Sequence, residues 1–158
     1  MTNESMFNLC ISELSEIIEG SVSLGAMPPL AGLFEPIGQI VVDVREVQSK
    51  DVLWTFESPL QHACLHSEEA FARGAMGVVV AGRRIEPWAG KFSVTVADSI
   101  AAMHRLMRCL RVDDGDLSAA IFGQDETTRE MTRAVWQQDF EAVRSIVASL
   151  QHRASSAA

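Results

Sequence analysis

The spacing of polar and apolar positions changes sharply within residues 67–83, SEEAFARGAMGVVVAGR. Residues 67–73 are predicted to form the last turns of a helix. Gly74 stands where a helix commonly ends in a left-handed conformation. The run Val78-Val79-Val80 then has no polar face. It therefore predicts a central strand that is buried on both sides, in a largely parallel sheet covered by helices. This stretch indicates an α/β fold.

The same periodicities predict the other elements. Apolar residues at helical spacing predict helices over residues 9–19 and 98–111, the second with Asp98 as its N-cap. Alternating residues predict strands over 21–25, 40–47, 52–56, 92–97 and 117–122. Residues 57–65 lack periodicity and are interpreted as a loop before a helix at 66–73. From Asp125 the chain is expected to be helical, with a bend near Gln138.

These elements predict a small mixed sheet of about five or six strands with helices on its faces. We expect residues 1–112 to form the α/β domain. Residues 113–158 are expected to add a short strand and one or two helices packed on that domain, although the apolar stripe of the last helix also fits a partner or homodimer seam.

Composition narrows the class of protein. The chain has 158 residues, 47% of them hydrophobic, and a formal net charge of −8. Such a chain suits a globular domain, and without a Lys/Arg cluster it is not expected to bind nucleic acid. Its three cysteines lack metal-ligand spacing and are expected to be free thiols in a reducing cytosol. No metal or other cofactor is expected. The first residues lack a basic, apolar signal sequence and no stretch is long enough to span a bilayer, so we expect a cytoplasmic protein without a membrane partner.

Three segments carry a family resemblance. Residues 43–47 (DVREV) stand beside a D-S-R-x-V pattern, residues 70–80 beside A-x-x-x-G-A-x-x-x-V-V, and residues 96–98 beside V-x-D. In this order they resemble the N-terminal domain of the Mur ligases of the MurE and MurF type. These are ATP-dependent amino-acid ligases that build the peptidoglycan peptide on a UDP-linked sugar. The resemblance covers residues 9–111.

The next family segment, the ATP loop T-G-x-x-G-K-T-T, is degenerate in this sequence. The corresponding residues are Gly123, Gln124, Asp125, Glu126, Thr127 and Thr128. Phosphate loops bind through backbone N–H groups and a lysine, whereas two carboxylates at that place repel a nucleotide. The sequence also ends at residue 158, before the family's nucleotide and amino-acid domains. We therefore expect a truncated homologue that is not an ATP-dependent ligase on its own.

The resemblance also implies where a ligand would bind. In the family, the serine of D-S-R and a D-G-H loop help hold the uridine nucleotide, and here Val44 and His62-Ala63-Cys64 stand at those positions. The candidate ligand-binding residues are Asp43, Val44, Arg45, Ser58, His62, Cys64 and His66.

Each of these candidates has a second interpretation. Asp43 and Arg45 lie two apart on a predicted strand, which also suits a structural ion pair. His62 and His66 suit a metal or acid–base site, or a solvated loop. Cys64 is a candidate nucleophile only if its thiol pKa is lowered.

The sequence is compatible with three functions. The first is a non-catalytic, Mur-ligase-like binding module that holds a small anionic or nucleotide-like ligand or a partner enzyme. The second is a repurposed enzyme of a specialised pathway that uses the loop at residues 57–66. The third is an acidic protein-interaction module of the inhibitor or immunity type. A polar, concave pocket favours the first two, and a flat acidic face or a large apolar seam favours the third.

Overall fold

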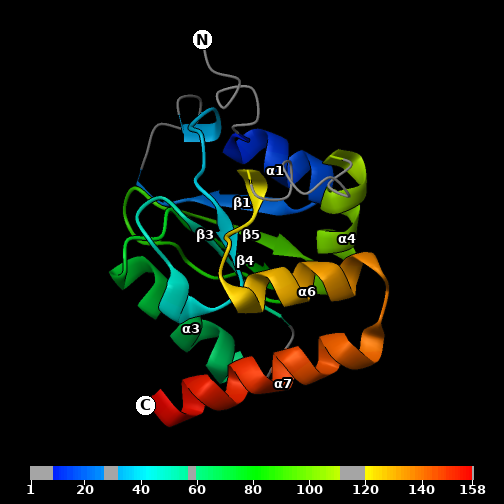
Figure 1. Ribbon diagram of the computed structural model, residues 1–158. Helices are drawn as coiled ribbons and strands as arrows, with labels where there is room; N and C mark the ends of the chain where they lie inside the picture. Colours follow the sequence, from blue (N-terminus) through cyan, green and yellow to red (C-terminus); the bar gives the residue numbers. More distant parts are fainter. Residues whose placement is uncertain (1–8, 27–31, 57–59, 111–119, 158) are drawn as a thin grey trace.

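The computed structural model describes residues 9–26, 32–56, 60–110 and 120–157 (Figure 1). The elements in chain order are α1 (Ile11–Ile18), β1 (Ser21–Leu24), β2 (Ile40–Val41), the 3₁₀ helix η2 (Val44–Glu46), β3 (Val52–Trp54), α3 (Leu60–Ala72), β4 (Gly77–Ala81), β5 (Phe92–Val96), α4 (Ser99–Leu110), α6 (Glu126–Trp136) and α7 (Phe140–Ala157).

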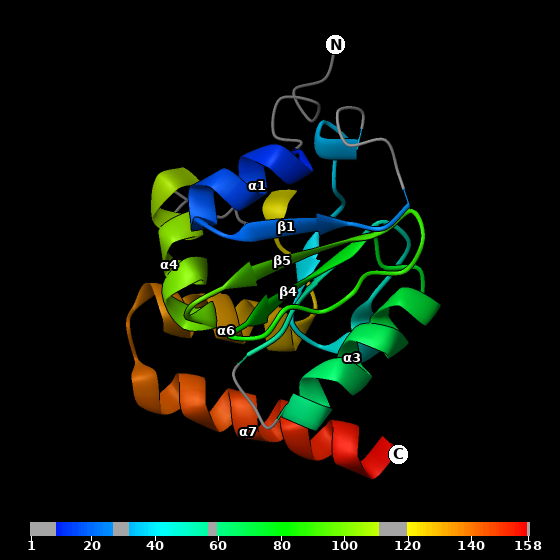
Figure 2. The same ribbon diagram turned by 180° about the vertical axis from the view of Figure 1, so that it is seen from behind.

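The strands form one mixed sheet of five strands in the order β1-β5-β4-β3-β2. β2, β3, β4 and β5 are parallel. β1 pairs antiparallel with β5 at the edge of the sheet (Figure 2). β4 is the central strand, with Leu53↔Val78 and Val78↔Ser93 in register on its two sides. The α/β class and the central position predicted for residues 78–80 are both confirmed.

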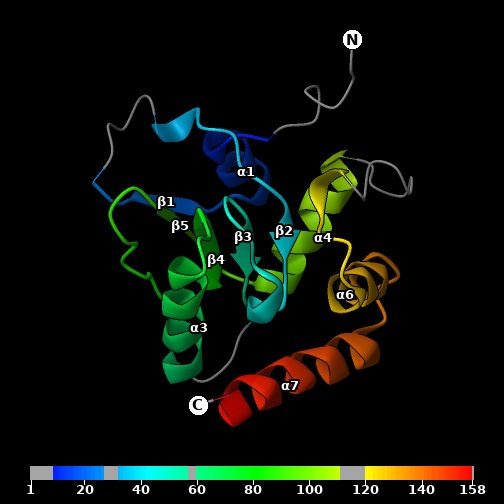
Figure 3. The same ribbon diagram turned by 60° about the vertical axis from the view of Figure 1, so that its left-hand side comes forward.

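Helices cover both faces of the sheet, which explains the uniformly apolar β4. Val79 is fully buried in the larger core, which α1, α4 and α6 complete. Val78 and Val80 belong to the second core, together with Ala70 and Phe71 of α3. Figure 3 shows α3 on one side of the sheet and α4 and α6 on the other. Alternate residues of β4 therefore face two separate layers of helices, and neither face tolerates a polar residue.

Aspartates stand at the starts of α4 and α7, and residues of positive φ follow α3 and α6. The Oδ1 atom of Asp98 accepts hydrogen bonds from the N–H groups of Ile100 and Ala101, both at 3.0 Å, so Asp98 starts α4 as predicted. Gly74 follows α3 with a φ of 104°. The bend between α6 and α7 is also confirmed, because Gln138 has a φ of 57° and Asp139 Oδ1 accepts the N–H of Ala142 at 3.2 Å.

The C-terminal helices pack on the same core as the sheet. Met131 and Val135 of α6 and Val143 of α7 are buried within it, and α7 also contacts α3. No helix within the described ranges is long and apolar enough to cross a membrane.

The predicted strand at residues 40–47 is wrong beyond Val41. Asp43 accepts the backbone N–H of Arg45 at 2.9 Å, and this local bond turns the chain into η2. Alternation in the sequence therefore continued past the point where the strand ends.

Two further predictions of secondary structure are wrong. Residues 60–65 are helical, so α3 begins at Leu60 rather than at His66. These residues are mostly good helix formers without amphipathic spacing, which is why periodicity missed them. The predicted strand at 117–122 falls partly outside the described residues. Within the described part, residues 120 and 121 are helical, and Phe122 makes only a single parallel bridge to Ile40.

Candidate functional site

Asp43 and Arg45 of the predicted ligand site form an ion pair at η2. Arg45 Nη2 lies 2.8 Å from Asp43 Oδ2, and Arg45 Nε lies 3.2 Å from Asp43 Oδ1. The hydrogen bond to Asp43 and then its charge raise the pKa of Arg45 above its usual value. Asp43 is almost fully buried, so this two-point contact fixes the guanidinium and compensates its charge.

The other predicted ligand residues are dispersed around this pair. Val44 is buried in the core on the α3 side of the sheet. His66 lies half-buried on α3, while Ser58 and the side chains of His62 and Cys64 lie outside the described part of the chain. The geometry therefore brings together Asp43 and Arg45, and a ligand-binding role for this set stays a prediction.

The segment compared with an ATP loop lies at the N-terminus of α6 and packs against β2. The Gly123 N–H donates to the carbonyl of Ile40 at 2.9 Å, and Gly123 leaves no room for a side chain because a Cβ there would lie 2.6 Å from Val41 Cγ1. Gln124 and Glu126 are exposed and Thr127 is half-buried. The segment follows the edge of the sheet closely instead of opening into a loop.

A carboxylate of the chain itself occupies the start of α6. Asp125 Oδ2 accepts the backbone N–H and the hydroxyl of Thr128, both at 3.0 Å. The hydroxyl oxygen of Thr128 in turn accepts the N–H of Val42 at 3.1 Å, in a buried position. A helix N-terminus attracts anions through its free N–H groups and its dipole. Here Asp125 already satisfies that attraction, and the network ties α6 to the end of β2.

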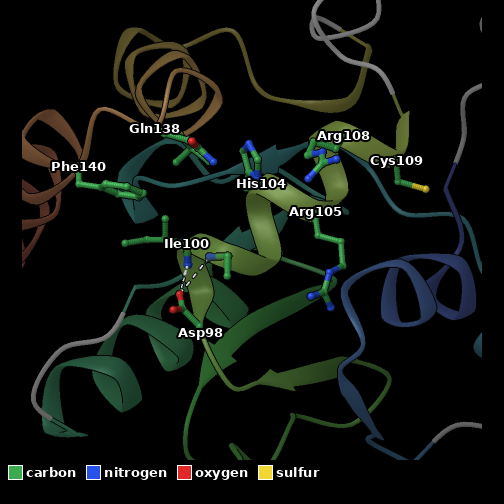
Figure 4. A pocket seen from close by; sticks show the side chains of 10 residues that line it. Asp98, Ile100, His104, Arg105, Arg108, Cys109, Gln138 and Phe140 are labelled. Carbon is green, nitrogen blue, oxygen red and sulfur yellow. Dashed lines mark hydrogen bonds between the residues drawn. The ribbon is translucent and has the colours of Figure 1, made fainter.

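A groove that the sequence analysis did not predict runs along the outer face of α4. It has a volume of about 760 Å³, and the junction between α6 and α7 forms its opposite wall (Figure 4). The groove is lined by Asp98, Ile100, Ala101, His104, Arg105, Arg108, Cys109, Val135, Gln138 and Phe140. The turn at Gln138, with its positive φ, brings Phe140 to face α4. A signal was present in the sequence, because residues 99–110 include three basic or imidazole side chains and no acidic one.

The charges in the groove are compensated to different degrees. Asp98 directs Oδ1 to two backbone N–H groups of α4. Arg105 Nη1 lies 2.8 Å from Glu19 Oε1, and both side chains are largely exposed. Arg108 is exposed, and within the described residues no carboxylate lies within ion-pair distance of it. Among the residues that the structure describes, Arg108 is therefore the arginine of the groove that has no carboxylate partner.

The other end of the groove is apolar and aromatic. Phe140 is 54% exposed, Ile100 is half-buried, and Val135 is buried. The ring of His104 lies 6.1 Å from that of Trp136, centroid to centroid, in a tilted arrangement that holds the imidazole against α6. Within the described residues, no group of three metal-binding side chains comes together. The groove thus offers charge and apolar surface for binding.

The fold described above is similar to part of the fold of a Mur ligase, as comparison with a solved structure shows. Crystal structure I of MurF from Acinetobacter baumannii matches with a TM-score of 0.51 at 19% identity, over 68% of this chain and 22% of that chain. A second crystal structure of the same MurF has a TM-score of 0.48 at 21% identity, over 63% of this chain and 20% of that one.

A further match is the structure of UDP-N-acetylmuramoylalanyl-D-glutamyl-2,6-diaminopimelate–D-alanyl-D-alanyl ligase from the same organism. Its TM-score is 0.48 at 20% identity, over 63% of this chain and 20% of that one. The chain therefore spans about a fifth of the length of the ligases that it matches. No sequence-family profile and no curated protein matches it. The likeness shows the fold alone.

Proposed function

We propose that this chain is a non-catalytic binding module with a Mur-ligase-like fold, and that it holds a small organic anion in the groove along α4. The observation that carries the proposal is Arg108, an exposed arginine without a described ion-pair partner, in a concave site of a chain whose net charge is −8. An acidic surface repels anions at long range, so an anion binds where cations are concentrated in a cleft.

The chemistry of the groove supports binding in two ways. An arginine donates charge-assisted hydrogen bonds to a carboxylate or phosphate in a planar, two-point arrangement. The volume of about 760 Å³ lies in the range of small-molecule sites, and the wall made by α6 and α7 encloses a ligand from the side opposite α4.

The start of α6 supports the non-catalytic part of the proposal. Ligation driven by ATP needs a phosphate cradle, and here Asp125 places a carboxylate at the helix N-terminus where such a cradle would bind phosphate. Glu126 adds a second negative charge to the same turn. A nucleotide triphosphate would meet repulsion at this position instead of donors.

A thermal-shift screen tests both parts. The panel contains UDP-sugars, simple organic carboxylates and phosphates, and ATP with and without Mg²⁺. We expect at least one organic anion to raise the melting temperature, and the Arg108→Gln variant to lose that shift. Arg45→Gln is the matched control, because it removes an arginine that is already paired with Asp43.

The screen has clear contrary outcomes. A shift that Arg45→Gln abolishes and Arg108→Gln preserves would move the site to η2, as the sequence predicted. Tight, stoichiometric binding of ATP with Mg²⁺ in calorimetry would contradict a non-catalytic module.

A further inference from the structure

We infer that the ligand of the groove is an amphipathic organic anion, with its acidic group at Arg108 and an apolar body that extends to Ile100 and Phe140. This inference rests on the proposed function and specifies the class of ligand. The inference follows from the arrangement of the groove, which is apolar at one end of α4 and positively charged at the other. Figure 4 shows Phe140 and Ile100 at one end, Arg108 and Cys109 at the other, and His104 between them.

The cationic end determines where the acidic group binds. Arg105 and Arg108 both lie in the C-terminal half of α4, and Arg105 is engaged by Glu19. The carboxylate that lines the other end, Asp98, already accepts two backbone hydrogen bonds at the start of the helix. A ligand carboxylate or phosphate is therefore attracted to Arg108 and repelled by Asp98, which gives the ligand one orientation.

The apolar end determines the rest of the ligand. Phe140 is 54% exposed although it is large and apolar, and it faces the groove on the side of Ile100. Buried Val135 also lines the groove. Covering such a side chain with an apolar group removes hydrophobic area from water and is favourable. A bare inorganic anion would leave this surface uncovered.

The distance between the two ends sets the size of the ligand. Ile100 and Arg108 are eight residues apart on one helix, and at 1.5 Å per residue they are separated by about 12 Å along its axis. A ligand that satisfies both ends must be roughly that long. His104, held against Trp136, would contact the middle of such a ligand.

Three probes separate charge from apolar surface. Decanoate carries both features, 1-decanol carries the apolar chain without the charge, and acetate carries the charge without the chain. Titration calorimetry below the micellar concentration is expected to rank decanoate at least tenfold tighter than either of the other two probes. Arg108→Gln should weaken decanoate about tenfold and leave 1-decanol unchanged, since one charge-assisted contact is lost. Phe140→Ser should weaken decanoate and 1-decanol alike.

A control and three contrary results complete the test. Arg84→Gln removes an exposed arginine outside the groove and should change nothing. If acetate binds as tightly as decanoate and depends on Arg108, the amphipathic inference fails while the proposed function stands. If decanoate and 1-decanol bind equally and Arg108→Gln has no effect, the site is merely apolar and the inference fails. If no probe binds to the folded wild-type protein, the inference fails, and the proposed function then depends on its own screen.

Discussion

Two regions of the molecule attract negative charge, the N-terminus of α6 and the groove along α4. At α6 the attraction comes from backbone N–H groups, and Asp125 satisfies it from within the chain. In the groove it comes from arginines, and Arg108 has no ion-pair partner within the described residues. Residue type alone therefore does not mark an anion site in this molecule. What matters is whether the chain supplies its own anion.

The pair of Asp43 and Arg45 extends the comparison. Arg45 was the cation expected to bind a ligand, but its guanidinium is held by Asp43 through two contacts. Arg108 lies on a helix without acidic residues and is left exposed. The start of α6 at Asp125 and the pair of Asp43 and Arg45, whose charges are satisfied within the chain, should contribute mainly to stability. The groove should contribute mainly to binding.

The largest expected effect on stability is at the N-terminus of α6, where Asp125 accepts hydrogen bonds from Thr128. Thr128→Val removes the acceptor of the Val42 N–H and the donor to Asp125, so it leaves a buried N–H unsatisfied. We expect the free energy of unfolding to fall by about 2–3 kcal/mol, measured by urea denaturation. Decanoate binding should not change, because the groove does not include this residue.

A second buried threonine of the same helix provides the control. The hydroxyl of Thr132 donates only to the Arg129 carbonyl one turn earlier, at 3.0 Å. Thr132→Val should therefore alter stability by about 0.5 kcal/mol or less, since such a local bond competes with the helix. Equal losses of unfolding free energy in the two variants would show that the hydrogen bonds between β2 and α6 add no more stability than a local helix bond.

An intermediate effect on stability is expected at Asp51, whose surroundings disfavour the ionised form of its carboxyl group. Burial, and to a lesser extent the charge of Asp125, raise the pKa of Asp51 above its ordinary value of 3.8, against the lowering effect of N–H groups from Gln48 and Gln39. A carboxyl with a raised folded pKa stabilises the fold when protonated, and that contribution is lost as the pH rises from about 3.8 through the folded value.

The Asp51→Asn variant tests this sign. The amide cannot accept both N–H groups, so part of its effect is a loss that does not depend on pH. The difference in unfolding free energy, variant minus wild type, should become more favourable to the variant between pH 4 and pH 7. Urea denaturation of both proteins at several pH values measures it. A difference that stays constant or falls across this range would mean that folding does not raise the pKa of Asp51.

The fold was largely predictable because its signals are local and repeated. The Val78–Val80 run indicated burial on both faces, the N-cap at Asp98 marked the start of α4, and the helical spacing expected from Asp125 matches α6. The strand predicted over residues 40–47 is wrong beyond Val41 because the Asp43 side chain accepts the Arg45 N–H, and this local bond overrides the alternating pattern. Local competition of this kind is weakly visible in a sequence.

The groove was missed for a different reason. Its walls come from α4 and from Phe140, whose proximity depends on the turn at Gln138 and on the packing of α6 against α4. The cations of residues 99–110 were visible in the sequence, but which of them already has a partner depends on α1. A site assembled from three separate elements requires the tertiary structure.

The smallest expected effect converts a compensated cation of the groove into an available one. Glu19 pairs with Arg105 on the surface, and Glu19→Gln keeps the size and backbone of the residue while removing its charge. We expect stability to change by less than about 1 kcal/mol, as is usual for an exposed ion pair. Decanoate affinity, measured by calorimetry, should rise about two- to fivefold because Arg105 can then turn to the ligand, and the gain should shrink as salt is added. Glu16→Gln is the matched control, because it makes the same change of charge on α1 without a described contact to Arg105. If both variants raise the affinity equally, net charge and not the release of Arg105 governs binding, and the distinction between compensated and available cations would not hold for this groove.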